Sequence, residues 1–276
     1  MPHSKCKIAA LGIALLMSLP LPALAGRGCE KREITPENLA AAAQTALTVA
    51  DALEAHNAPV ALVARVGTDL SRYGMTYSHA GFAVRDHNNG RWTVVHLLNR
   101  CGTDKASVYA QGLVNFFADD LINQDARIVW LPEAEAERLA DYLRQLPRNS
   151  LLNPNYNLIS RPGSERTQNS TAWVLETLAV AQLPGDQPIT RQRTFAEVSQ
   201  HGFTPDTIRI AYGKRVLGGL FSANTDFTDH PVSTRLQGQY PVVTVRSIFR
   251  YMQANGLAAE QMEWRNGQLQ KTPGAG

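Results

Sequence analysis

The stretch Tyr77-Ser78-His79-Ala80-Gly81-Phe82-Ala83-Val84 decides the fold predicted for this chain. A histidine opens an apolar run here, and a second β-rich run, Trp92 to Leu98, carries His96. Asn89-Gly90 lies between the two runs, and an Asn-Gly pair in that position is the strongest short-range sign of a β-hairpin. Alternate side chains of a strand share one face, so the hairpin can bring His79 and His96 within reach of each other.

Far downstream, a polar turn opens an apolar helix over Gln168 to Glu176. Two histidines on paired strands that face a helix N-terminus form an arrangement suited to acyl transfer. Ser, Thr and Asn before an apolar helix are also ordinary N-caps, so a purely structural role for Ser170 stays open.

The rest of the chain predicts a mixture of helices and strands. Thr35 as N-cap and Pro36 begin a helix that ends near His56, and its expected buried stripe is Leu39, Ala43, Leu47, Ala50 and Leu53. Further strands are expected at 60–66, 127–131 and 207–211, and further helices at 132–146, 170–181, 195–200 and 244–254. We expect residues 103–121 to be loop and mostly helix. The polar stretch 224–230 could line a cleft or be a solvated turn, and the turn is favoured.

The N-terminus has the three parts of a secretory signal peptide. Lys5 and Lys7 precede an apolar run over 8–19, and a small-residue cleavage site ends at Ala25. The run is shorter than the roughly 18 residues that a membrane span needs, and two prolines follow it. We therefore expect cleavage after Ala25 and a periplasmic or secreted protein. Loss of the two lysines lowers the net charge from +3 to +1, which is too balanced to indicate a nucleic-acid partner.

Two cysteines, Cys29 and Cys101, remain after Cys6 leaves with the signal peptide. In an exported chain they most simply form one disulfide. The alternative is that Cys101 is a reactive thiol.

The order of these features resembles a known group of proteins. A strand over 60–66, the Ser78-His79-Ala80-Gly81-Phe82 motif, a second strand with His96, and a distant Asn169-Ser170-x-x-Trp173-Val174 helix are similar to the circularly permuted NlpC/P60-like, papain-like group. More narrowly, the chain resembles the uncharacterised DUF2145 group of exported bacterial proteins. This narrower resemblance covers most of the mature chain, and the enzyme motif covers about 60–180.

The resemblance implies a catalytic site made of His79, His96 and Ser170. His79 matches the base, His96 matches the polar partner that orients it, and Ser170 stands where the group has its cysteine nucleophile. Serine there departs from the pattern, because a hydroxyl does not ionise at a helix N-terminus as a thiol does and needs the base during attack.

The activity implied by the resemblance is acyl transfer or amide/ester hydrolysis in the cell envelope, on cell-wall peptides or acyl lipids. The alternative is a catalytically inactive envelope protein that binds a peptide or lipid in the same groove. A zinc site made of His79, His96 and Asp69 has no supporting Cys/His spacing or HExxH motif, and no cofactor is indicated.

The predicted organisation is a signal peptide (1–25), one α+β domain (26–270) and a disordered tail (271–276). The resemblance implies a papain-like, circularly permuted NlpC/P60-like antiparallel sheet packed on helices. This core covers about 60–180, with an added N-terminal helix and a C-terminal extension over about 185–270. The substrate, the oligomeric state and the role of the extension are left open by the sequence.

Overall fold

The computed structural model describes residues 34–119, 122–145, 151–185, 188–213 and 223–272. Its centre is a seven-stranded sheet with the strand order β4-β3-β2-β1-β5-β8-β9, in which every neighbouring pair is antiparallel. A separate two-stranded sheet pairs β6 with β7. The strands are β1 (Val60–Arg65), β2 (His79–His87), β3 (Gly90–Asn99), β4 (Ala106–Gly112), β5 (Ala126–Trp130), β6 (Asp206–Arg209), β7 (Gln239–Val242), β8 (Glu260–Arg265) and β9 (Gln268–Lys271).

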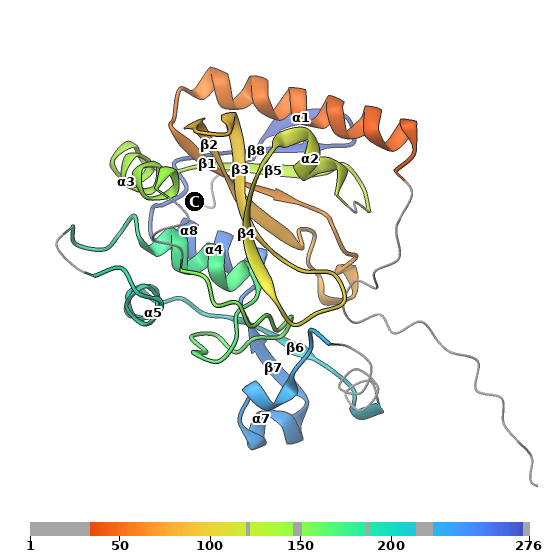
Figure 1. Cartoon of the computed structure of the whole chain (residues 1–276), viewed down its shortest axis with the longest axis vertical. Helices are drawn as coiled ribbons and strands as arrows, with labels where there is room; N and C mark the ends of the chain where they lie inside the picture. The colour runs from red at the N-terminus through yellow and green to blue at the C-terminus, as the bar shows by residue number, and fades with distance from the viewer. Residues whose placement is uncertain (1–33, 120–121, 146–150, 186–187, 214–222, 273–276) are drawn as a thin grey trace, which may run out of the picture.

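Helices cover both faces of the large sheet (Figure 1). α1 and α2 pack on one face, while α3, α4 and α8 pack on the other. The helices are α1 (Pro36–His56), α2 (Leu113–Ala118), α3 (Glu133–Arg144), α4 (Ser170–Ala179), α5 (Arg191–Gln200), α7 (Val232–Gln237) and α8 (Val245–Ala254), with 3-10 turns η1 (Ser71–Tyr73) and η2 (Phe227–Asp229). The predicted α+β class with an antiparallel sheet is confirmed.

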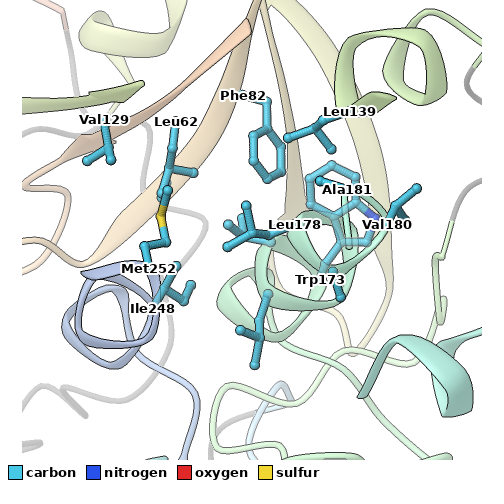
Figure 2. Packing of buried hydrophobic residues seen from close by; sticks show 14 of the residues in the cluster. Leu62, Phe82, Val129, Leu139, Trp173, Leu178, Val180, Ala181, Ile248 and Met252 are labelled. Atoms are coloured by element: carbon cyan, nitrogen blue, oxygen red, sulfur yellow. The ribbon is translucent and has the colours of Figure 1, made fainter. Parts of the chain in front are cut away.

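The central strands β1, β2, β3 and β5 are buried on both faces over most of their length, so each face of the sheet has its own core. On the α3/α4/α8 side, Leu62, Phe82 and Val129 from the sheet meet Leu139, Trp173 and Met252 from the helices (Figure 2). On the α1/α2 side, Val63, Ala83 and Val94 meet Val49, Leu53 and Phe116. Alternate residues of one strand therefore belong to different cores.

The predicted hairpin is present as β2 and β3, with its loop one residue earlier than expected. His87 pairs with Gly90, so Asn88-Asn89 forms the two-residue loop and Gly90 is the first residue of β3. Gly90 has a φ of 121°, which a residue with a side chain rarely adopts.

The buried stripe predicted for α1 is right at Leu53 and wrong at Leu39 and Leu47, while Ala43 and Ala50 are partly buried. Leu39 and Leu47 are 48% and 65% exposed, and beside Leu53 the helix buries Ala42, Thr45, Ala46, Val49 and Ala52. The helix is rich in alanine all round, so more than one of its faces is apolar enough to pack. The sheet selects the face with the smaller side chains.

Several short elements were not predicted. β4 occupies part of the stretch expected to be loop and helix, and β7, β8, β9 and α7 come from the less regular C-terminal third. Lys271, expected in the tail, is the last residue of β9 and pairs with Met262 of β8. β4 and β9 lie at the edges of the large sheet, β8 lies next to the β9 edge, and β7 belongs to the small sheet, so none of these strands shows a clear alternation.

The turn over 224–230 is packed rather than solvated. Asp229 and His230 are only 7% and 2% exposed. Asp229 accepts hydrogen bonds from Ser164 Oγ (2.6 Å) and the Arg161 backbone N–H (2.8 Å), and His230 Nε2 lies 2.7 Å from the Ile159 carbonyl oxygen. Polar residues can satisfy one another inside a protein, which composition alone does not show.

No helix in the described ranges combines the length and the apolar character that a membrane span requires. The predicted signal peptide, its cleavage site and Cys29 lie outside the described residues. Cys101 is disulfide-bonded, and its pairing with Cys29 stays a prediction.

Candidate functional site

The two predicted histidines are in direct contact. His79 is the first residue of β2, and its Nε2 lies 2.8 Å from Nδ1 of His96 in β3. The side chains are 7% and 0% exposed. One ring donates and the other accepts, so each fixes the tautomer of the other.

Gly81 makes room for this pair. A Cβ at position 81 would lie 2.8 Å from the Cβ of His96 and 2.9 Å from a methyl group of Val94. The glycine of the Ser-His-Ala-Gly-Phe motif is therefore explained by close packing of β2 against the β3 side chains.

The histidines form a cluster with the buried Arg65 and Phe116, and the half-buried Asp119 lies at its edge. The Phe116 ring centroid lies 5.9 Å from that of His79 and 5.3 Å from that of His96, and the Arg65 guanidinium stacks 4.9 Å from it. Arg65 Nη2 donates to Asp119 Oδ2 at 2.9 Å. Sequence reasoning missed these three residues. The available signal was an arginine that ends an otherwise apolar strand.

Ser170 does not join the histidines. It is the half-buried first residue of α4, and Asn169 caps the helix by accepting from the Ala172 backbone N–H at 2.7 Å. α4 packs on the face of Phe82, whose ring lies 6.2 Å from Trp173 (Figure 2). His79 points to the opposite face, because it lies three positions before Phe82 in the same strand and it contacts Phe116 of α2.

The predicted His79–His96–Ser170 site is therefore not assembled. A base and nucleophile must approach to about 2.6–3.2 Å, somewhat more without substrate, and here the sheet lies between them. Asp69, the third ligand of the zinc alternative, instead accepts from the Ser71 backbone N–H at 2.9 Å. Among the described residues, no group of three His, Cys, Asp or Glu side chains is placed to hold a metal.

The start of α4 is supported by a buried ionic network. Glu176 is 1% exposed, and its carboxylate accepts from Arg191 at 2.8 and 3.0 Å and from Gln168 Nε2 at 2.7 Å. Burial raises the pKa of Glu176, and the bonds from Arg191 and Gln168 oppose that rise. This network fixes α4 against α5.

A polar cleft of about 410 Å³ lies between the η1 loop and the small sheet. Its lining comprises all four residues of β6, together with Arg72, Tyr73, Met75 and Arg246. Arg246 spans the cleft, because its Nε donates to Asp206 Oδ2 (3.0 Å) and its Nη1 to the Gly74 carbonyl (3.0 Å). Its residues come from positions 72–75, 206–209 and 246, so no local motif pointed to it.

Asp206 is the acidic member of the cleft, and its charge is already satisfied. Its carboxylate accepts from Arg246, from Arg250 (3.1 Å) and from Thr244 Oγ1. Burial raises the pKa of this carboxyl, but the hydrogen bonds outweigh burial and hold the pKa below its usual value. Asp206 is therefore ionised at neutral pH and neutralises arginine charge.

A second, smaller cleft of about 250 Å³ separates α1 from α2 and the adjoining ends of β3 and β4. Its lining is mostly apolar and includes Leu47, Trp92, Leu113 and Val114. Leu47 and Val114 are exposed at its rim.

A family described as an uncharacterized protein conserved in bacteria (DUF2145) matches residues 52–252. The chain belongs to this family. No curated protein and no solved structure matches it.

The DUF2145 match includes both histidines, Ser170 and every residue named in the polar cleft. It begins within α1 and ends within α8, so β8 and β9 lie beyond it.

Proposed function

We propose that this DUF2145 protein is an exported, catalytically inactive binding protein of the cell envelope that holds a peptide in its polar cleft. The proposal takes the binding alternative in preference to acyl transfer or amide/ester hydrolysis through His79, His96 and Ser170. The observation that carries it is the separation of Ser170 from the two histidines by the sheet.

The polar cleft supports a binding role. Its volume of about 410 Å³ lies within the range of small-ligand sites, roughly 300–1,000 Å³. Its lining offers arginines and a strand and, among the described residues, no His that could activate a hydroxyl such as that of Thr207. A site with this chemistry holds a polar chain and leaves it intact.

An acyl lipid is the second candidate ligand. The smaller cleft favours it, because Leu47 and Val114 expose apolar surface at the rim of a mostly apolar hollow. Uptake of a fluorescent fatty acid that is abolished by Leu47→Glu would favour the lipid over the peptide.

The permuted NlpC/P60-like, papain-like relationship is part of the proposal. An antiparallel sheet with two histidine strands, followed in sequence by α4, supports it. The placement of Ser170 away from the histidines departs from the active members of that group, as an inactive descendant would.

Export through the signal peptide is also proposed, and N-terminal sequencing of periplasmic protein should begin at Gly26.

A thiol probe tests the catalytic question without a substrate. Ser170→Cys places a thiol on the first turn of α4, and its iodoacetamide rate is compared with and without His79→Ala. We expect equal rates, because His79 faces the other side of the sheet. We also expect no labelling of native Ser170 by a serine-reactive phosphonate.

Two results would contradict the inactive-protein reading. One is phosphonate labelling at Ser170 that His79→Ala removes. The other is a fast Ser170→Cys reaction that slows to the rate of a free thiol in the double variant, since an imidazole beside a thiol lowers its pKa.

A further inference from the structure

The small sheet has two outer edges, and hydrogen bonding shows which backbone groups point outward from β6. The Ile210 backbone N–H donates to the Gly238 carbonyl at 3.0 Å, continuing the β6–β7 ladder. In an antiparallel pair, residues whose backbone N–H and C=O point toward the partner strand alternate with residues whose backbone groups point away from it. The N–H and C=O groups of Asp206, Ile208 and Ile210 therefore face β7, and those of Thr207 and Arg209 face away from it.

The outer edge of β7 is protected, whereas that of β6 is not. Pro241 pairs with Thr207, so the backbone groups of Pro241 also point away from the partner strand. A proline offers no N–H to a new strand at that edge. The corresponding positions on β6 are Thr207 and Arg209, which both carry an N–H donor. Strand addition to this sheet is thus blocked on one side and allowed on the other.

The open edge of β6 faces the polar cleft. Thr207 and Arg209 both line it, opposite Tyr73 and Met75 of the η1 loop. Within the part of the chain that the structure describes, no backbone hydrogen bond reaches the outward groups of Thr207 or Arg209. Each of these residues therefore offers one donor and one acceptor to a ligand backbone.

The charge of the cleft selects for acidic groups. Three arginines (Arg72, Arg209 and Arg246) line it against the single carboxylate of Asp206. That carboxylate is already bonded to Arg246 and Arg250. Among the described residues, Arg72 and Arg209 form no salt bridge, although Arg72 stacks on the Tyr73 ring and its charge helps to lower the pKa of Asp69. Arg209 is therefore the more open guanidinium for a carboxylate of a ligand, and Arg72 lines the cleft with it.

We propose that an extended acidic peptide binds as a third strand of the small sheet, paired with the open edge of β6 and held by Arg72 and Arg209. The inference rests on the proposed peptide-binding function and gives the class of peptide and its mode of binding. Main-chain hydrogen bonds to Thr207 and Arg209 supply affinity, and carboxylates on alternate residues of the ligand supply specificity.

Fluorescence anisotropy with a labelled hexapeptide of alternating glutamate and valine tests the proposal on the full mature chain. Two ligand controls are matched to it: the lysine–valine peptide, and a glutamate–valine peptide N-methylated on alternate amides. We expect the lysine peptide to bind at least tenfold more weakly. N-methylation should also weaken binding about tenfold, since it removes the donors that the edge of β6 accepts.

Variants of Thr207 test the same contact from the protein side. Thr207→Pro removes an N–H that the β6–β7 ladder does not use, and should weaken binding about tenfold. Thr207→Val keeps the N–H and should bind like the native protein. Arg209→Gln should weaken binding about fivefold at low salt, whereas Arg138→Gln on the surface of α3 should have no effect. Near-UV circular dichroism confirms that each variant is folded.

The outcomes separate this inference from the proposed function. If the glutamate peptide binds but neither Thr207→Pro nor N-methylation weakens it, strand addition is wrong and peptide binding stands. If the lysine peptide binds equally well, the acidic preference is wrong. If neither peptide binds at millimolar concentration, both the inference and the proposed peptide-binding function fall.

Discussion

Replacing Arg191 by Met should destabilise the protein strongly and in a pH-dependent way. The change removes two of the three donors to the Glu176 carboxylate, which is 1% exposed, and leaves only the bond from Gln168. A buried charge that loses its partner costs about 3–5 kcal/mol. Spread over a domain of this size, that loss corresponds to a fall in Tm of roughly 6–20 °C.

The sign of the pH effect follows from Glu176. Burial already raises the pKa of this carboxyl, and loss of Arg191 removes the main opposing interaction, so the pKa rises further. A carboxyl whose pKa is higher in the folded state than in the unfolded state holds its proton to a higher pH when the protein is folded. The folded state therefore loses stability as the pH rises from the unfolded-state pKa through the folded-state pKa. The variant should therefore lose less stability at pH 5 than at pH 8.

Urea unfolding of native protein and variant at pH 5 and pH 8 measures both effects. Glu176→Gln in the Arg191→Met background should recover most of the loss, because no unpaired charge is then buried. Arg138→Met is the matched control: its partner Glu135 lies on the surface, and loss of such a pair costs about 0–1 kcal/mol. Equal losses at both pH values, with no recovery in the double variant, would refute the reasoning.

Two further predictions follow from the hairpin and the loop after β3. Gly81→Ala should destabilise the protein by about 1–3 kcal/mol, because the added Cβ would clash with His96. Gly112→Ala is the control and should be neutral, because a Cβ there meets open space. Equal melting temperatures for the two variants would show that His96 can shift at no cost. Cys29 and Cys101 of periplasmic protein should both resist iodoacetamide until reductant is added, and immediate labelling of both would show that they are not paired.

The sequence carried enough information for the central hairpin and the main helices. Long apolar runs bounded by turn residues gave β1, β2, β3 and β5, and N-caps such as Thr35 and Thr244 fixed helix starts to within a residue. These signals are local, because caps and turns act through groups a few residues apart. The contact of His79 with His96 was also predictable, since a hairpin joins residues close in sequence.

Only the tertiary structure decided which side of the sheet each helix covers. α4 is buried all round from Thr171 to Ala179, so its own sequence does not show which face of β2 and β3 it covers. The choice separated Ser170 from the histidines, exposed Leu39 and Leu47 of α1, and brought Arg72, Arg209 and Arg246 to one cleft. The physical reason is that local interactions set the secondary structure, whereas the packing of faces depends on side chains far apart in sequence, which meet only when the whole chain has folded.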